Sequence, residues 1–233
     1  MNKLIILDLD GTLVDSLADI HAAANHMLTF FGIAEATKET VRGFVGDGTR
    51  VFVERLLAGN DQRDTDRALR VFHDYYRAHS LDQTHPYPGM DRVLDELEAT
   101  GWTVGVLSNK DTHLCKAVIS HLPELTGRFS FVFGGDSFDR RKPSPEPVER
   151  ILKMTGINRE RAVMVGDSSN DVGAGQNAGI HTIAVSYGFT DREELMALAP
   201  DRIVDVPVDL PAVAHDHCLA GKIRLNFNVG GNR

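Results

Sequence analysis

The chain has 233 residues, of which 42% are hydrophobic and 25% charged, and its formal net charge is -8 with a pI near 5.6. This length suits one α/β core plus a modest second domain, and the composition is typical of a globular protein. The negative charge offers no electrostatic footprint for nucleic acid or an anionic membrane, so we expect neither as a partner.

Cysteine content and the N-terminal segment bear on the cellular compartment. Cys115 and Cys218 are the only cysteines, so no disulfide framework is indicated and a reducing compartment fits. The apolar N-terminal stretch carries Asp8 and Asp10, which argues against both a signal peptide and a membrane span. We therefore expect a cytoplasmic protein.

The first predicted element is a buried strand at residues 4–7 that leads into Asp8-Leu9-Asp10-Gly11-Thr12. Because side chains repeat with a period of two along a strand, Asp8 and Asp10 should share a face. Two carboxylates that close repel unless a cation lies between them or one takes a proton, so metal binding and separate acid and base roles are both open. Gly11 permits a sharp turn or a close approach of the backbone. Solvated loop acids or helix caps are the simpler interpretation of the pair taken alone.

The next segment, from Ser16 to about Gln83, predicts helices and no strand. Apolar side chains recur at helical spacing after Ser16, which we expect to be the N-cap of the first helix. Gly32 marks the end of that helix. Further helices are predicted at residues 38–45, 51–57 and 66–79. We expect residues 16–84 to form a separate helical domain inserted after the first strand.

Beyond the turn-rich segment His85-Pro86-Tyr87-Pro88-Gly89, strands alternate with helices. This alternation predicts a doubly wound parallel sheet covered on both faces, built from residues 1–15 and 85–210. Residues 211–233 lack clear periodicity, and we expect them to form a poorly ordered tail. The predicted strands lie at residues 103–107, 129–133, 162–165 and 182–185, and the predicted helices at 90–100, 112–121, 147–155, 172–178 and 192–198.

Three further polar clusters follow predicted strands. They are Ser108-Asn109, then Lys142-Pro143 in the loop after the strand at 129–133, and Gly166-Asp167-Ser168-Ser169-Asn170-Asp171. In an open α/β sheet, ligands bind outside the carboxyl ends of the strands. These clusters and Asp8 should therefore converge on one rim of the sheet.

Taken together, these motifs resemble those of the haloacid dehalogenase superfamily of phosphatases, over essentially residues 3–210. Within that superfamily the chain is most similar to the phosphoglycolate phosphatases. This closer likeness rests on the helical insertion, the turn Val45-Gly46-Asp47-Gly48-Thr49-Arg50, the segment Tyr87-Pro88-Gly89 and Ser186-Tyr187-Gly188-Phe189. The resemblance implies a Rossmann-like core with an inserted all-helical cap domain.

The catalytic expectations centre on the first motif. We expect Asp8 to attack phosphorus and form a phosphoaspartyl intermediate, because splitting a slow hydrolysis into two steps is an effective strategy. Asp10 should protonate the leaving oxygen and then activate water. The resemblance implies that Mg²⁺ is held by the Asp8 carboxylate, the Asp10 backbone carbonyl and Asp167. Asp171 could hold Lys142 or a metal-bound water, or simply cap its helix.

Substrate contacts are expected from several loops. Ser108, Asn109 and Thr12 should surround the transferring phosphoryl group, and Lys142 should offset its negative charge. Arg50 is our candidate for binding a substrate carboxylate. Lys142 lies in a run of basic residues, and such runs are usually solvated surface.

The expected function is hydrolysis of a small phosphorylated metabolite, with 2-phosphoglycolate as the predicted substrate, by a monomer or homodimer. The alternatives are a sugar phosphomutase, another small-metabolite phosphatase or a pyrophosphatase of the same superfamily. A phospho-acceptor switch without turnover is the non-enzymatic alternative. Asp10 argues against the switch, because it is placed to activate water against an acyl phosphate.

Overall fold

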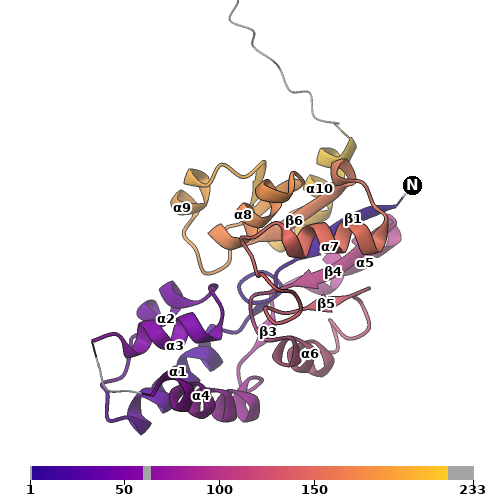
Figure 1. Ribbon diagram of the computed structural model, residues 1–233. Helices are drawn as coiled ribbons and strands as arrows, with labels where there is room; N and C mark the ends of the chain where they lie inside the picture. The colour runs from indigo at the N-terminus through magenta and orange to yellow at the C-terminus, as the bar shows by residue number, and fades with distance from the viewer. Residues whose placement is uncertain (1, 60–63, 220–233) are drawn as a thin grey trace, which may run out of the picture.

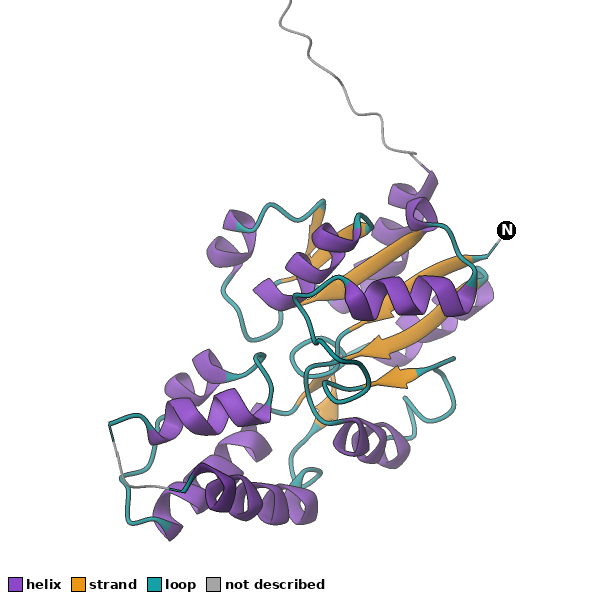
Figure 2. Cartoon of the chain, in the orientation of Figure 1, coloured by secondary structure: helices purple, strands orange, loops and turns teal. Residues whose placement is uncertain are grey.

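The protein, in a computed structural model that describes residues 2–59 and 64–219, contains a six-stranded parallel sheet flanked by helices (Figures 1 and 2). The strand order is β5-β4-β1-β6-β7-β8, so the first strand of the chain lies in the middle of the sheet. The predicted doubly wound α/β core is confirmed. The strands are β1 (Lys3–Leu7), β4 (Trp102–Leu107), β5 (Val132–Phe133), β6 (Ala162–Gly166), β7 (His181–Val185) and β8 (Arg202–Val204).

Side-chain alternation along β1 divides the core into two layers. Ile5 and Leu7 belong to one hydrophobic cluster, and Leu4 and Ile6 to another on the opposite face. The first cluster is covered by α5 (Met90–Ala99), α6 (Thr112–His121) and α10 (Leu210–Leu219), and the second by α7 (Glu146–Thr155) and α8 (Ser169–Ala178). The helix α9 (Arg192–Ala197) and the 3₁₀ turns Arg159–Arg161 and Pro207–Asp209 complete the core.

The inserted helices form a second lobe with its own apolar interior (Figure 1). Its largest contributors include Met27, Phe52, Phe72 and Tyr76. The predicted all-helical cap is therefore confirmed, whereas its boundaries at residues 16 and 84 stay a prediction. The four helices are α1 (Leu17–Phe30), α2 (Lys38–Phe44), α3 (Thr49–Leu57) and α4 (Thr65–His79).

A short antiparallel ribbon that the sequence did not predict joins the two lobes. β2 (Val14–Asp15) pairs with β3 (His85–Pro86), so the two chain segments that enter and leave the cap run side by side. The Asp19 carboxylate fastens this crossing by accepting hydrogen bonds from the backbone N–H groups of Gln83 and Thr84 and from the Thr84 hydroxyl. Strands of two residues are too short for a periodic pattern.

The C-terminal region differs from the expectation. Residues 210–219 form α10, and Leu210 and Ala214 are buried in the core cluster. The expected absence of a regular element after residue 211 is therefore wrong up to residue 219. The buried residues Leu210, Pro211 and Ala214 make too narrow an apolar stripe to be distinguished in the sequence. Residues 220–233 of the predicted tail lie outside the described residues. None of the helices in the described part of the chain has the length and hydrophobicity needed to span a membrane.

Candidate active site

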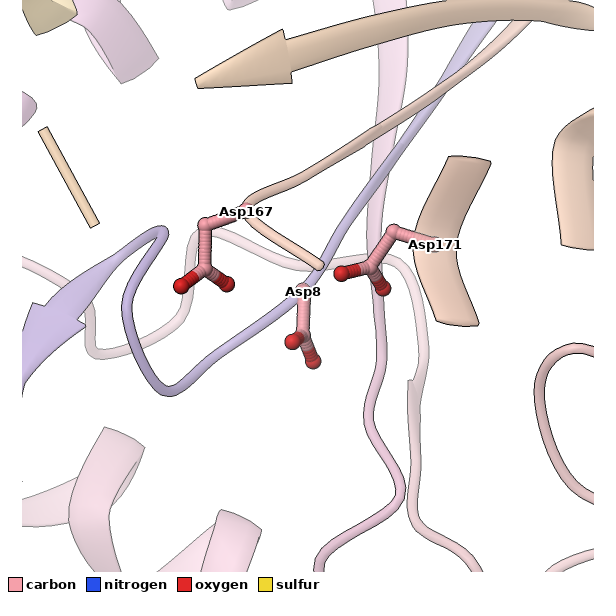
Figure 3. A group of neighbouring side chains, drawn as sticks. All are labelled: Asp8, Asp167 and Asp171. Carbon is pink, nitrogen blue, oxygen red and sulfur yellow. The ribbon is translucent and has the colours of Figure 1, made fainter. Parts of the chain in front are cut away.

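Three buried carboxylates meet at the carboxyl edge of the sheet (Figure 3). Asp8 directly follows β1, Asp167 directly follows β6, and Asp171 lies in the first turn of α8. One oxygen of each carboxylate lies within 4.8 Å of the others. β1 and β6 are paired neighbours in the sheet, which is why residues far apart in the sequence converge here, as the strand-end pattern predicted.

Close backbone packing positions Asp167. Its Oδ2 accepts a 2.7 Å hydrogen bond from the Phe189 backbone N–H, and the Thr12 hydroxyl lies 3.4 Å from its Oδ1. Gly11 adopts a φ of +81°, and a Cβ placed there would lie 2.2 Å from Asp167 Oδ2. Both the left-handed conformation and the lack of space require glycine at this position.

Lys142 supplies a buried positive charge beside the acids. Its Nζ lies 2.9 Å from Asp8 Oδ1 and 2.6 Å from Asp171 Oδ1, and it donates a 2.7 Å hydrogen bond to the Leu107 carbonyl. The other Asp171 oxygen accepts hydrogen bonds from the backbone N–H and the hydroxyl of Ser168. Asp171 therefore both caps α8 and fixes Lys142, so the two roles considered for it coexist.

The electrostatics of the cluster favour an additional cation. Burial raises the pKa of Asp8 to about 6, because the nearby Lys142 offsets only part of the cost of desolvation and the other acids add to it. Burial and the charges of Asp171 and Asp8 raise the pKa of Asp167 well above its usual value. Carboxylate oxygens are the ligands that Mg²⁺ prefers. The donor set and its excess negative charge thus fit a hard divalent cation.

Asp10 points to different partners from those of Asp8. Its Oδ1 accepts a 2.5 Å hydrogen bond from the Ser16 hydroxyl and a 2.8 Å bond from Lys110 Nζ, which also lies 3.0 Å from Oδ2. Ser16 is the N-cap residue of α1, as expected, but its hydroxyl donates to Asp10 and not to the backbone of the helix. The Leu17 backbone N–H donates a hydrogen bond to the Asp15 carboxylate.

A cavity of about 300 Å³ lies between the core and the cap. Asp8, Asp10, Asp167, Ser108 and Asn109 line it from the core. The cap contributes a turn and several apolar side chains, among them Gly46, Asp47, Gly48, Phe52, Phe72 and Tyr76. Thr12 and Lys142 do not line the cavity; Thr12 lies against Asp167, and Lys142 contacts Asp8.

Two asparagines of the core hold the cap turn at the mouth of this cavity. Asn109 Nδ2 donates to the Gly46 carbonyl at 2.8 Å and to the Lys142 carbonyl at 2.9 Å. Asn170 Nδ2 donates to Asp47 Oδ1 at 2.7 Å and lies 3.3 Å from the Gly46 carbonyl. The cap is therefore docked on the core in this structure.

Arg50 is not brought to this site. It is exposed near the start of α3, where its guanidinium lies 2.7 Å from Asp66 Oδ1, and it is not among the residues that line the cavity. The ion pair directs the side chain toward α4. The arginines that do line the cavity are Arg42 and Arg55. Arg50 therefore lies outside the cavity in this structure, and its expected contact with a substrate carboxylate stays a prediction.

Lys110 is the residue of the site that our sequence analysis missed. Its side chain is buried and contacts both Asp10 and the Tyr76 hydroxyl of the cap. The available signal was a cation directly after Ser108-Asn109 at a strand end. Its partners come from distant parts of the chain, which a local pattern does not reveal.

The sequence and the fold are similar to those of known proteins. The family described as haloacid dehalogenase-like hydrolase matches residues 5–185. A phosphoglycolate phosphatase of Psychrobacter arcticus is 37% identical over 211 residues, covering 87% of this chain and 91% of the relative. Phosphoglycolate phosphatase 1 of Pseudomonas aeruginosa is 37% identical over 215 residues, covering 89% and 78%. The crystal structure of a predicted phosphoglycolate phosphatase from Haemophilus somnus superposes with a TM-score of 0.86 at 28% identity, covering 91% of this chain and 97% of that one.

Proposed function

The chain belongs to the haloacid dehalogenase-like hydrolases, and we propose that it is a magnesium-dependent phosphatase that hydrolyses 2-phosphoglycolate through a phosphoaspartyl intermediate. The observation that carries this proposal is the position of Asp8. Its carboxylate lines the cavity between core and cap, faces Lys142 at 2.9 Å and shares a cluster with Asp167. The choice of substrate is supported by the curated relatives, which are named phosphoglycolate phosphatases.

Asp8 acts as the nucleophile in this proposal. One carboxylate oxygen attacks phosphorus while the bond to the bridging ester oxygen breaks, which leaves an acyl phosphate on Asp8 and releases the alcohol. Lys142 holds the attacking carboxylate and balances negative charge as the phosphoryl group approaches. Ser108 and the backbone around Asn109 line the same cavity and surround the transferred oxygens.

Asp10 acts as general acid and then as general base. It lies two residues after Asp8 and lines the same cavity, so it can protonate the departing alcohol oxygen. In the second half-reaction it removes a proton from the water that attacks phosphorus, which restores the Asp8 carboxylate and releases phosphate. Ser16 and Lys110 orient the Asp10 carboxylate through the contacts described above.

A magnesium ion would be held by the carboxylates of Asp8 and Asp167 together with the Asp10 backbone carbonyl. Bound there, the ion neutralises charge on the phosphate oxygens. Asp171 and Thr12 support this group from outside, because Asp171 fixes Lys142 and the Thr12 hydroxyl points to Asp167. The buried, mutually repelling carboxylates are the feature of the chain that supports a cation at this point.

The cap limits the reaction to small esters. The docked turn at Gly46–Gly48 covers the cavity, and a volume of about 300 Å³ leaves space for a small metabolite rather than a polymer. Exclusion of water protects an acyl phosphate from side reactions and strengthens the charge interactions around it.

The proposal is tested by phosphate release from a panel of compounds with and without magnesium. The panel contains 2-phosphoglycolate, hexose phosphates, nucleotides and pyrophosphate. We expect sustained turnover of 2-phosphoglycolate that stops when magnesium is chelated and falls by at least about 10³-fold in Asp8→Asn. A single stoichiometric burst would identify a phospho-acceptor switch. Faster turnover of another compound, or isomerisation of a hexose phosphate, would overturn the assigned substrate.

A further inference from the structure

A buried cation and a buried hydroxyl from different lobes meet in the cavity. Lys110 follows β4 in the core, and Tyr76 lies on α4 of the cap. Lys110 Nζ donates a 2.7 Å hydrogen bond to the Tyr76 hydroxyl oxygen. Both side chains are buried, and both line the cavity that also contains Asp8 and Asp10.

The Tyr76 hydroxyl keeps a proton that it can donate. Its oxygen accepts from Lys110, and no acceptor for its own hydrogen is found among residues 2–59 and 64–219. Burial raises the pKa of Tyr76 to about 12, so the hydroxyl stays protonated near neutral pH. A donor that lines the cavity and has no acceptor in the described protein can therefore donate to a molecule bound there.

The other cations found on the cavity wall, among the residues that the structure describes, are more exposed than Lys110. Arg55 lies 2.5 Å from Asp47 Oδ2, with its side chain 41% exposed. Arg42 donates to the Phe189 carbonyl and to Asp191. Lys110 is therefore the most deeply buried cation on the cavity wall.

Resting on the proposed function, we propose that Lys110 and Tyr76 bind the carboxylate of 2-phosphoglycolate and select for it. With the phosphoryl group at Asp8, the bridging oxygen faces Asp10, and the substrate carboxylate carbon is only two bonds from that oxygen. Lys110 is in direct contact with Asp10, so its ammonium lies on the side of the site that the carboxylate must occupy. The substrate carboxylate thereby shares the Lys110 ammonium with Asp10 and accepts a hydrogen bond from the Tyr76 hydroxyl.

The surroundings of the pair strengthen this interaction. The Phe72 ring stacks on Tyr76 with centroids 5.7 Å apart, and Ile20, Phe52 and Leu114 line the same cavity. A charge pair is stronger where apolar groups keep water away. An uncharged substituent would lie against Lys110 without forming a charge pair with it, which explains how the site would favour esters that carry a carboxylate.

The test compares 2-phosphoglycolate with 2-phosphoglycolamide, in which a neutral amide replaces the carboxylate, as substrates of Lys110→Met and Tyr76→Phe. We expect Lys110→Met to lose on the order of 100-fold in relative kcat/KM for 2-phosphoglycolate over the amide, chiefly through KM, and Tyr76→Phe to lose about 10-fold. Tyr76→Phe keeps the ring stacked on Phe72, so it tests the proposal even where Lys110→Met folds poorly. Lys116→Met and Tyr75→Phe, on α6 and α4 but outside the cavity lining, should keep the wild-type ratio.

Equilibrium binding of the two esters in an Asp8→Asn background provides a readout independent of turnover. In that background, adding Lys110→Met should weaken the binding of 2-phosphoglycolate and leave the binding of the amide unchanged. If Lys110 only orients Asp10, both esters lose kcat equally and the carboxylate role is overturned. A wild-type protein without preference for 2-phosphoglycolate would refute the proposed substrate as well. A wild-type preference that survives in both variants would refute this inference alone.

Discussion

The Lys142 ammonium lies 2.6 Å from the Asp171 carboxylate, and the two side chains are 2% and 1% exposed. The same ammonium faces Asp8 at 2.9 Å. Removing one partner of a buried pair leaves an uncompensated charge, which costs more than the pair itself contributes. Lys142 therefore connects the stability of the core to the geometry of the nucleophile.

We expect Lys142→Met to lower the free energy of unfolding by about 3–5 kcal/mol, because it leaves the Asp8 and Asp171 carboxylates buried without their counter-ion. Phosphatase activity should fall to background in the same variant. Urea unfolding and phosphate release measure the two effects. Arg150→Met is the matched control, since Arg150 is exposed and lies 4.0 Å from Glu146 on the helix surface; it should cost no more than about 0.5 kcal/mol. Similar losses in both variants would contradict the prediction.

The acidic cluster predicts a pH dependence of stability in magnesium-free buffer. The pKa of Asp8 is raised by burial to about 6 in the folded protein, against 3.8 for the free side chain. A raised folded-state pKa adds stability that is present below about pH 4 and lost as the pH rises through about 6. Asp8→Asn removes this penalty, so it should exceed the wild type in stability above pH 6 by up to about 3 kcal/mol.

Calorimetry in the presence of a chelator between pH 4 and pH 8 measures this difference. Asp74→Asn changes an exposed carboxylate on α4, and its difference in stability from the wild type should not increase with pH. Added magnesium should raise the unfolding temperature of the wild type, because it binds only the folded cluster. The rise should be larger at pH 8 than at pH 5, because the ion binds carboxylates that have lost their protons. A constant difference between Asp8→Asn and the wild type over this range would count against the electrostatic account.

The hydrogen bonds of Asn170 predict its role in closing the cavity. Asn170 on α8 reaches Asp47 and the Gly46 carbonyl of the cap turn. Asn170→Ala should loosen that turn, which raises KM for a small ester about 3- to 10-fold with a smaller change in kcat. Hydrogen exchange of residues 45–48 should become faster in the same variant.

Gln176→Ala is the comparison for Asn170→Ala. Gln176 lies on the same helix and donates to the Leu198 and Ala199 carbonyls rather than to the cap. Its loss should leave exchange in residues 45–48 unchanged. Equal acceleration in both variants would mean that α8 as a whole, and not the contact with the turn, controls the cap.

Much of the site was predictable because parallel strands deliver their carboxyl ends to one edge. Asp8 and Asp167 follow uninterrupted apolar strands, so their meeting followed from topology alone. Lys142 was predictable only through the family resemblance, since a basic run gives no sign that its last member is buried while Arg140 and Arg141 are exposed.

Side-chain direction and cross-lobe contacts were not predictable. The sequence places Arg50 beside a glycine turn, but in the structure its guanidinium pairs with Asp66 on the surface of the cap. Lys110 needs Tyr76 and Asp10, residues that only the docked cap brings together. The ribbon of β2 and β3 and the helix α10 were missed because each buries too few side chains to leave a periodic signal.

Gly11 provides the sharpest test of how the first loop builds the site. A Cβ there would lie 2.2 Å from Asp167 Oδ2, and residues that carry a side chain rarely adopt a φ of +81°. Gly11→Ala should therefore displace Asp167, lower kcat/KM by at least about 100-fold and abolish stabilisation by magnesium. Gly32 has a similar φ of +67°, and no atom of the described residues lies within 4 Å of an added Cβ, so Gly32→Ala should cost only about 1 kcal/mol in unfolding free energy and keep full activity. Because backbone strain is common to the two variants, any excess loss in Gly11→Ala reports the collision with Asp167. Equal activity in the two variants would show that the acidic cluster tolerates the displacement and does not depend on this close approach.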